Sequence, residues 1–251
     1  MVSAGSRITA GVCALLSGAG IDRVQVTGLP RVAVISTGSE LQKPGTPLSY
    51  GKIYDANSAY LMARLRELGI EQATAACVGD DGKALESAFR TALRDYDLVI
   101  STGGVSVGQA DLVPPTLKAL GGEDIFHGIA VKPGMPAAFF TVDGKPVLAL
   151  SGNPFACVVT FELLGRRALA ALSGDAAFLP VTETAKLSGD EKKARPVRRF
   201  VSAQLKGGFV SLSPVTQNGR TRMLPEGNCL AELPEGKDPL AAGTELTVYH
   251  F

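Results

Sequence analysis

The stretch DLVISTGGVSVGQAD, residues 97–111, runs an apolar segment directly into a glycine-rich loop and ends on an acid. Residues 97–102 combine apolar and β-branched side chains, a pattern typical of a buried strand. The glycines that follow are Gly103, Gly104 and Gly108, and glycine backbone can bring its N–H groups around an anion. The stretch therefore predicts a strand followed by an anion-binding loop, with Asp111 just beyond it. A tight turn between a strand and a helix is the alternative interpretation.

Strand and helix patterns alternate on both sides of this stretch. Buried strands are expected at residues 29–36, 71–79, 97–102 and 145–151. Helices are expected at residues 58–68, 80–96, 110–120 and 155–174, with Asn57 or Ser58 as the cap of the first. This alternation predicts an α/β fold class, a three-layer α/β/α domain with a mostly parallel sheet.

The two ends of the chain carry other patterns. Residues 7–18 predict a helix and residues 23–26 a short strand. After Gly174 the sequence changes to short strand patterns with glycine and proline turns, at residues 181–188, 198–206, 209–215 and 244–251. The sequence thus predicts a helix and connecting strand in residues 1–29, the α/β domain in residues 30–176, and a small all-β domain in residues 177–251.

Composition limits the classes of partner. The chain has 251 residues, a net charge of +1 and 45% hydrophobic residues, which fits a globular protein and gives no sign of nucleic acid or a membrane surface as a partner. The apolar segment 8–21 is too short to span a membrane and lacks the basic start of a signal peptide, so a cytoplasmic protein is expected. The cysteines are far apart in the sequence, and we expect buried reduced thiols rather than disulfides or zinc ligands at Cys13, Cys77, Cys157 and Cys229.

Polar and glycine-rich segments follow each of the predicted parallel strands: TGSE (37–40), GDD (79–81), TGGVSVGQAD (102–111) and SGNP (151–154). Ligands of such sheets bind beyond the carboxyl ends of the strands, so these segments should meet at one edge. Asp80 and Asp111 belong to two of these segments. Acids beside a phosphate site imply a divalent cation, because carboxylate and phosphate repel each other. Capping of the next helix is the alternative for Asp80 and Asp81.

Three further residues are candidates for the same edge. Lys132 precedes Pro133 and Gly134 and is either an anion ligand or a solvated surface lysine. His127 is a candidate hydrogen-bond donor, and Glu40 is either a further acid of the site or a surface residue. The chain has no Walker loop, no G-x-G-x-x-G fingerprint and no G-x-S-x-G elbow.

Six segments in fixed order carry a resemblance: PRVAVISTGSEL, GKIYDANSAYL, VGDDGKAL, DLVISTGGVSVGQAD, KPGMP and SGNPFACVVTFE. Together they resemble the molybdopterin molybdenumtransferase family, which includes MoeA and the gephyrin E-domain. The resemblance implies insertion of molybdate into adenylylated molybdopterin, with release of AMP and a requirement for Mg²⁺. It implies that Asp80 and Asp111 hold the metal, and that these two acids, Lys132 and Glu40 are catalytic. The substrate-binding residues that it implies are Thr37, Gly38, Ser39, Thr102, Gly103, Gly104, Ser106, Gly108, His127, Gly152, Asn153 and Pro154.

The chain departs from the family pattern at several positions. Ser39 stands where the family usually has an acid, Met135 where it usually has a lysine, Gln109 where an acid is common, Ser151 where it has a proline, and Ser202 where an arginine is expected. Each lost cation weakens a pocket for an oxyanion. A non-catalytic molybdopterin-binding or scaffold module is therefore a second hypothesis. A third is a molybdopterin adenylyltransferase, which the TGGVSVG loop and the β domain disfavour.

The resemblance also bears on size and partners. Family members carry further domains before the segments quoted above, so a fragment or a naturally short relative is expected. The partners implied are a small-molecule substrate, a second copy of the chain in a homodimer, and a molybdopterin adenylyltransferase.

Overall fold

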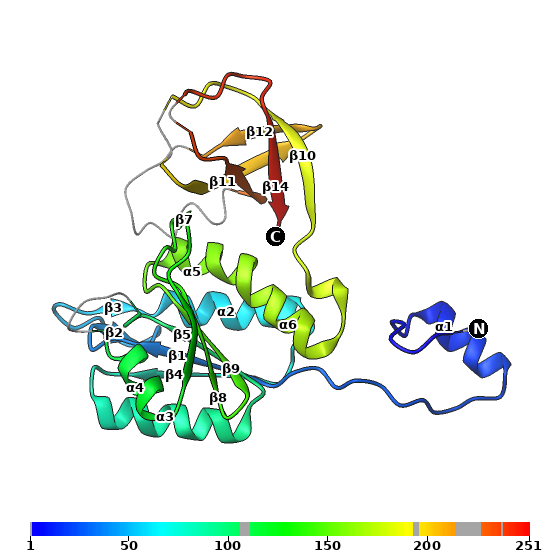
Figure 1. Ribbon diagram of the computed structural model, residues 1–251, viewed down its shortest axis with the longest axis horizontal. Helices are drawn as coiled ribbons and strands as arrows, with labels where there is room; N and C mark the ends of the chain where they lie inside the picture. Colours follow the sequence, from blue (N-terminus) through cyan, green and yellow to red (C-terminus); the bar gives the residue numbers. More distant parts are fainter. Residues whose placement is uncertain (1, 106–110, 193–195, 214–226, 237) are drawn as a thin grey trace.

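The computed structural model describes residues 2–105, 111–192, 196–213, 227–236 and 238–251. A six-stranded sheet lies at the centre of the larger part of the molecule (Figure 1). Its strands, in spatial order, are β4 (Ala73–Val78), β1 (Val32–Thr37), β5 (Leu98–Thr102), β9 (Lys145–Leu150), β8 (Ala138–Val142) and β6 (Glu123–His127). The first four are parallel and the last two antiparallel. The predicted mostly parallel sheet is confirmed.

Helices cover both faces of this sheet because its central strands are apolar on both sides. Val34, Ile100 and Leu148 face one core, under α2 (Ala56–Glu67), α5 (Pro154–Thr160), the π-helical turn η1 (Phe161–Gly165) and α6 (Arg166–Ser173). Ile35 and Val99 face the other core, under α3 (Gly82–Asp95) and α4 (Val113–Ala119). This arrangement is the three-layer α/β/α architecture that the sequence predicts.

A second six-stranded sheet lies apart from the first (Figure 1). Its order is β12 (Phe209–Leu212), β10 (Thr182–Leu187), β14 (Glu245–His250), β13 (Cys229–Leu233), β11 (Arg198–Lys206) and β7 (Val131–Lys132). An additional pairing of β12 with β11 curls five of these strands around their own core, which confirms the small all-β part. The edge strand β7 comes from the loop between β6 and β8 of the α/β part and pairs in parallel with β11.

Smaller elements complete the fold. A 3₁₀ turn, η2 (Ala176–Phe178), links α6 to β10. The two-stranded parallel sheet of β2 (Leu41–Gln42) and β3 (Ile53–Tyr54) lies beside the larger sheet (Figure 1). Among the described helices, none combines the length and the apolar character that crossing a membrane requires.

Several predictions from the sequence are wrong. The N-terminal helix α1 (Ala10–Gly18) forms, but residues 23–26 form no strand, since Val24 and Val26 are exposed and pair with no neighbouring strand. The cap of α2 is Asp55, whose Oδ1 accepts from the amide of Ser58 at 3.0 Å, so neither Asn57 nor Ser58 is the cap. All cysteines are free, but only Cys157 and Cys229 are buried, while Cys13 and Cys77 are exposed.

Candidate functional site

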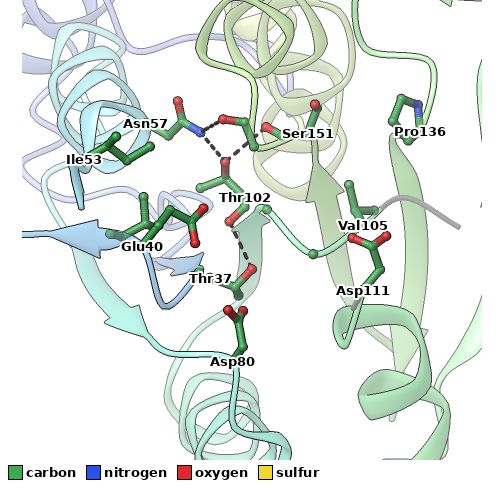
Figure 2. Close-up of a pocket in the computed structure, with 15 residues that line it drawn as sticks. Thr37, Glu40, Ile53, Asn57, Asp80, Thr102, Val105, Asp111, Pro136 and Ser151 are labelled. Atoms are coloured by element: carbon green, nitrogen blue, oxygen red, sulfur yellow. Dashed lines mark hydrogen bonds between the residues drawn. The ribbon is translucent and has the colours of Figure 1, made fainter. Parts of the chain in front are cut away.

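A cavity of about 320 Å³ opens at the carboxyl edge of the larger sheet (Figure 2). The loops after β1, β4, β5 and β9 all reach it, as the strand pattern predicts. Its walls are formed by Thr37, Gly38, Glu40, Leu41, Ile53, Asn57, Asp80, Thr102, Gly103, Gly104, Val105, Asp111, Pro136, Ser151 and Gly152. The structure therefore brings nine of the sequence-predicted site residues to one cavity: Thr37, Gly38, Glu40, Asp80, Thr102, Gly103, Gly104, Asp111 and Gly152.

The glycines of this edge allow backbone to pack against backbone. A Cβ atom on Gly103, whose φ is +92°, would lie 2.4 Å from the carbonyl oxygen of Thr37. A Cβ atom on Gly152 would lie 3.4 Å from the Cα of Gly103. The amide of Gly103 donates to the carbonyl of Leu150 at 3.0 Å, and that of Gly38 donates to Val78 at 3.1 Å. The amides of Gly38 and Gly103 therefore donate within the fold. Gly103 and Gly152 allow close backbone packing, and Gly103 does not supply the free donor that the loop pattern predicts.

The adjacent acids Asp80 and Asp81 have different tasks. The Oδ1 atom of Asp81 accepts from the amide of Ala84 at 2.7 Å, so Asp81 is the cap of α3. Asp80 instead lines the cavity, and its Oδ2 atom accepts from the amide of Ser39 at 2.8 Å. The amide of Asp80 in turn donates to Oγ of Ser39 at 2.9 Å. The capping alternative therefore holds for Asp81 and not for Asp80.

The electrostatic character of the cavity is negative. Glu40, Asp80 and Asp111 all line it, and no lysine, arginine or histidine is found among its described lining residues. Figure 2 shows Glu40 and Asp111 on opposite sides of Thr37 and Thr102, with Asp80 below Thr37. An anionic ligand would be repelled here unless a cation lay between ligand and carboxylates.

The oxygen donors of the cavity suit Mg²⁺. Magnesium is commonly bound through one or two carboxylates together with phosphate oxygens of the substrate. Within the described ranges, no group of three or more histidine, cysteine or acidic side chains is arranged as a metal cage. Asp80 and Asp111 therefore fit a cation that takes its remaining ligands from substrate and water.

The thiols near the cavity are poor nucleophiles. Cys157 is fully buried in α5, and burial raises its pKa to about 12, against a smaller opposite effect of a hydrogen bond with Thr102. The pKa of Cys77 on β4 is also raised, first by burial and then by the charges of Asp55 and Glu40. Because the thiolate is the reactive form, thiol chemistry is disfavoured at both positions.

Lys132 and His127 do not line the cavity. Lys132 is exposed in β7, where its backbone is paired with Arg199 of the second sheet. His127 supports the loop after β5 instead, since its Nε2 atom lies 2.9 Å from the carbonyl oxygen of Val105, which can only accept. Ser106 and Gly108 fall outside the described residues.

Three other predicted site residues, Ser39, Asn153 and Pro154, are not among the described lining residues but lie close to them in the sequence. Ser39 contacts Asp80 as described above. Asn153 caps α5 through a 3.2 Å hydrogen bond from the amide of Ala156, and Pro154 occupies the first position of that helix.

Sequence reasoning missed several lining residues, of which Asn57 is the most connected. Its Nδ2 atom donates to Oγ1 of Thr102 at 2.6 Å and to the carbonyl of Gly152 at 3.0 Å. The position of Asn57 at the start of a helix suggested only a cap. The signal that could have identified it is that the α2 N-terminus follows a strand ending near the same edge. Leu41, Ile53 and Pro136 were not assigned to the site either, whereas Val105 and Ser151 belong to segments that were expected at this edge.

Two family models cover most of the chain. Residues 33–171 match the model described as a probable molybdopterin binding domain, and residues 184–251 match the MoeA C-terminal region, domain IV.

Curated relatives and solved structures agree with these matches. The chain is 35% identical over 243 residues to a protein named molybdopterin molybdenumtransferase from Staphylococcus aureus, covering 95% of this chain and 58% of that protein. The values for a protein of the same name from Staphylococcus epidermidis are 35% over 248 residues, 97% and 59%.

Among solved structures, the molybdopterin biosynthesis MoeA protein of Pyrococcus horikoshii superimposes with a TM-score of 0.84 at 31% identity, over 99% of this chain and 61% of that one. A molybdenum cofactor biosynthesis protein from Pyrococcus furiosus gives a TM-score of 0.72 at 25% identity, over 100% and 78%. The chain thus spans less than two thirds of the length of the curated relatives that it matches.

Proposed function

The chain belongs to the molybdopterin molybdenumtransferase family, and from this premise we propose that it acts in molybdenum cofactor biosynthesis. The proposed reaction is insertion of molybdate into the dithiolene of adenylylated molybdopterin, with cleavage of the pyrophosphate link and release of AMP. The observation that carries the proposal is that Asp80 and Asp111, from two different loops, line one cavity at the carboxyl edge of the sheet.

The substrates of this reaction are anionic, and every charged side chain among the described lining residues of the cavity is negative as well. A pyrophosphate group could therefore bind there only together with a cation. When bound, Mg²⁺ would offset the charge that develops on the phosphate oxygens. Asp80 and Asp111 would hold the metal, with Glu40 as a third acid on the far side of Thr37 (Figure 2).

The fixed geometry of the acids supports this role. Asp80 is held by the Ser39 amide through one carboxylate oxygen, so its carboxylate has a defined orientation. Gly103 packs closely against Thr37 and against Gly152, so the backbones of the loops after β1, β5 and β9 are in direct contact. A rigid arrangement of charges costs little reorganisation when substrate binds, which favours both binding and catalysis.

A second candidate function is binding of molybdopterin without turnover. The observation that favours it is that neither of the two positions at which a lysine would meet the substrate, 132 and 135, lines the cavity. Lys132 is exposed on β7, and Met135, which stands where the family usually has a lysine, is half-exposed and does not line the cavity. Molybdate would then meet few charge-assisted donors from the described residues.

An assay of AMP release separates these functions. The chain is incubated with adenylylated molybdopterin, molybdate and Mg²⁺, and AMP is quantified. Asp80→Asn and Asp111→Asn should each lower the rate at least tenfold, because a neutral amide is a poor Mg²⁺ ligand. Asp81→Asn is the matched control and should keep the wild-type rate, because asparagine also caps helices well.

Each outcome has a defined meaning. Pterin binding without AMP release supports the second candidate. Release of pyrophosphate from ATP in the presence of molybdopterin would indicate an adenylyltransferase. Neither pterin binding nor AMP release by the wild-type chain would overturn both proposals.

A further inference from the structure

Asn57 links three segments that meet at the cavity. It is the second residue of α2, and its side-chain amide reaches the end of β5 and the loop after β9 (Figure 2). The Nδ2 atom donates to Oγ1 of Thr102 at 2.6 Å and to the carbonyl oxygen of Gly152 at 3.0 Å. Since a carbonyl can only accept, the NH₂ group must be the side of the amide that faces Gly152.

The hydroxyl of Thr102 continues this chain of hydrogen bonds. It accepts from Asn57 and donates to the carbonyl oxygen of Ser151 at 3.2 Å. The amide of Gly103 adds a direct bond to Leu150 at 3.0 Å. The loops after β5 and β9 are therefore connected to each other and, through Asn57, to a helix outside both of them.

The two loops have no side-chain packing at their closest approach. Gly103 and Gly152 meet backbone to backbone, and Gly103 also lies against Thr37. The strands β5 and β9 are paired as far as Thr102 and Leu150, and beyond that point the hydrogen bonds of Asn57 and Thr102 join the two loops. The bonds from Asn57 thus join three residues that line the cavity.

The helix that carries Asn57 is itself firmly anchored. Farther along α2, Nε of Arg64 lies 2.7 Å from Oε1 of the buried Glu162, and the hydroxyl of Tyr60 donates to the same oxygen at 2.9 Å. Asp55 caps the start of the helix. A side chain on a firmly anchored helix has a fixed position, so it can hold the segments that it contacts in place.

We propose that Asn57 is a positioning residue that sets the separation of the loops after β5 and β9, and through it the affinity of the cavity for the pterin substrate. The effect on affinity rests on the proposed function, whereas the effect on the loops does not. Asn57 acts through its two N–H donors, and its own oxygen is not required.

The first measurement needs no ligand. In the full chain, hydrogen exchange of the Gly103 amide is followed by NMR for the wild type, Asn57→Ala and Asn57→Asp. Both variants should exchange about tenfold faster, because each loses two hydrogen bonds that hold the loop. Asn57→Asp keeps a side-chain oxygen but lacks both donors, so it should behave as the alanine variant does.

The second measurement is the affinity for molybdopterin, by fluorescence titration. Both Asn57 variants should bind roughly tenfold more weakly, the loss expected for one to two hydrogen bonds. Asn228→Ala is the matched control, because Asn228 makes two analogous bonds to the backbone of Leu205 in the other sheet. Its Gly103 exchange and its affinity should equal those of the wild type.

A double-mutant cycle tests whether Asn57 acts through Thr102. Thr102→Val removes the Thr102 hydroxyl, which accepts from Asn57, and so breaks the same hydrogen bond. It can replace an Asn57 variant that does not fold. The two single variants share the loss of the Asn57–Thr102 bond, so the loss of affinity in the double variant Asn57→Ala with Thr102→Val should be smaller than the sum of the two single losses. Thr102→Ser, which keeps the hydroxyl, should restore binding to within about twofold of the wild type.

The outcomes distinguish this proposal from the proposed function. Strictly additive losses, unchanged Gly103 exchange, or wild-type affinity in Asn57→Asp together with weak binding in Asn57→Ala would each overturn the positioning role. The last result would mean that the Asn57 oxygen contacts the ligand directly. If the wild-type chain binds no molybdopterin, the proposed function fails, and the exchange measurement alone then decides whether Asn57 holds the loops.

Discussion

Ser39 and Asp80 hold each other in a reciprocal pair across two loops. The amide of Ser39 donates to Oδ2 of Asp80 at 2.8 Å, and the amide of Asp80 donates to Oγ of Ser39 at 2.9 Å. The pair fixes one oxygen of a carboxylate that lines the cavity. Ser39 stands where the family usually has an acid, so this chain has one negative charge fewer beside Asp80.

Ser39→Ala should weaken the apparent affinity for Mg²⁺ in the AMP-release assay several-fold. The variant loses the acceptor of the Asp80 amide, so the loop that carries the carboxylate becomes less ordered. Stability should fall by no more than about 1 kcal/mol, because the pair is exposed to solvent. Ser39→Thr keeps the hydroxyl and should match the wild type; equal Mg²⁺ affinity in Ser39→Ala would show that the pair does not matter for the metal.

Gly103→Ala should destabilise the protein far more than Gly121→Ala. Both glycines have positive φ, +92° and +82°, and alanine costs about 1–2 kcal/mol in such a conformation. Only Gly103 has no room, since its Cβ would meet the Thr37 carbonyl oxygen at 2.4 Å, and overpacking adds about 1–3 kcal/mol. Urea denaturation of both variants measures the difference, and equal midpoints would contradict the tight packing of these loops.

Glu162→Ala should cost about 3–5 kcal/mol of unfolding free energy, because it removes the buried carboxylate that both Arg64 and Arg166 contact. Glu162 is 1% exposed and contacts Arg64 at 2.7 Å and Arg166 at 3.4 Å. Burial lowers the pKa of Arg166, and the charge of Glu162 opposes that shift. The control is Glu67→Ala, which removes the 65% exposed carboxylate at 2.9 Å from Arg64 and should change stability by less than about 1 kcal/mol. Similar losses in both variants would refute the special role of the buried acid.

Ser101→Ala should make the protein more stable by about 1 kcal/mol, which raises the melting temperature by about 2–4 °C. The hydroxyl of Ser101 is buried in β5 and has no hydrogen-bond partner in the part of the chain that the structure describes. Ser36→Ala is the counterpart, because the Ser36 hydroxyl pairs with that of Ser58 at 2.5 Å and its loss should lower stability. Calorimetry of the two variants should give shifts of opposite sign.

Thiol labelling should divide the cysteines into two pairs. In the native protein a water-soluble maleimide should modify Cys13 and Cys77, which are exposed, and leave Cys157 and Cys229 intact. Because the pKa of Cys77 is raised, its thiolate fraction at neutral pH is small, and its labelling rate should still increase with pH at about pH 9. Mass spectrometry identifies the modified sites, and rapid labelling of Cys157 would contradict its burial.

The central sheet could be predicted because its parallel strands are buried on both faces and therefore appear as continuous apolar runs. The antiparallel strands β6 and β8 could not, since Phe139 and Phe140 sit in a short segment without a clear boundary from its neighbours. The false strand at residues 23–26 shows the converse. Val24 and Val26 have strand-forming side chains, but a strand also needs a partner, and the sequence does not reveal whether one exists.

The cavity was partly predictable for a similar reason. Asp80 and Asp111 follow predicted parallel strands, so their common edge follows from topology alone. Asn57 is 45 residues from Thr102 and 95 from Gly152, and no local pattern indicates such contacts. Lys132 was expected at the cavity, but its backbone pairs with β11 in the second sheet, and no local sequence pattern predicts that pairing.

The pairing of β7 with β11 has a consequence for expressing the two parts of the protein separately. Cutting after α6 would sever the covalent link but not the shared sheet, because β7 would stay with the α/β part. The separated β part would lose its neighbour along β11 and expose Phe200 and Leu230, which pack against Val131, Val159 and Leu163. Pro136, four residues beyond Lys132, borders the cavity. The segment that contains β7 therefore joins the two parts of the protein, and the residues that follow β7 reach the cavity.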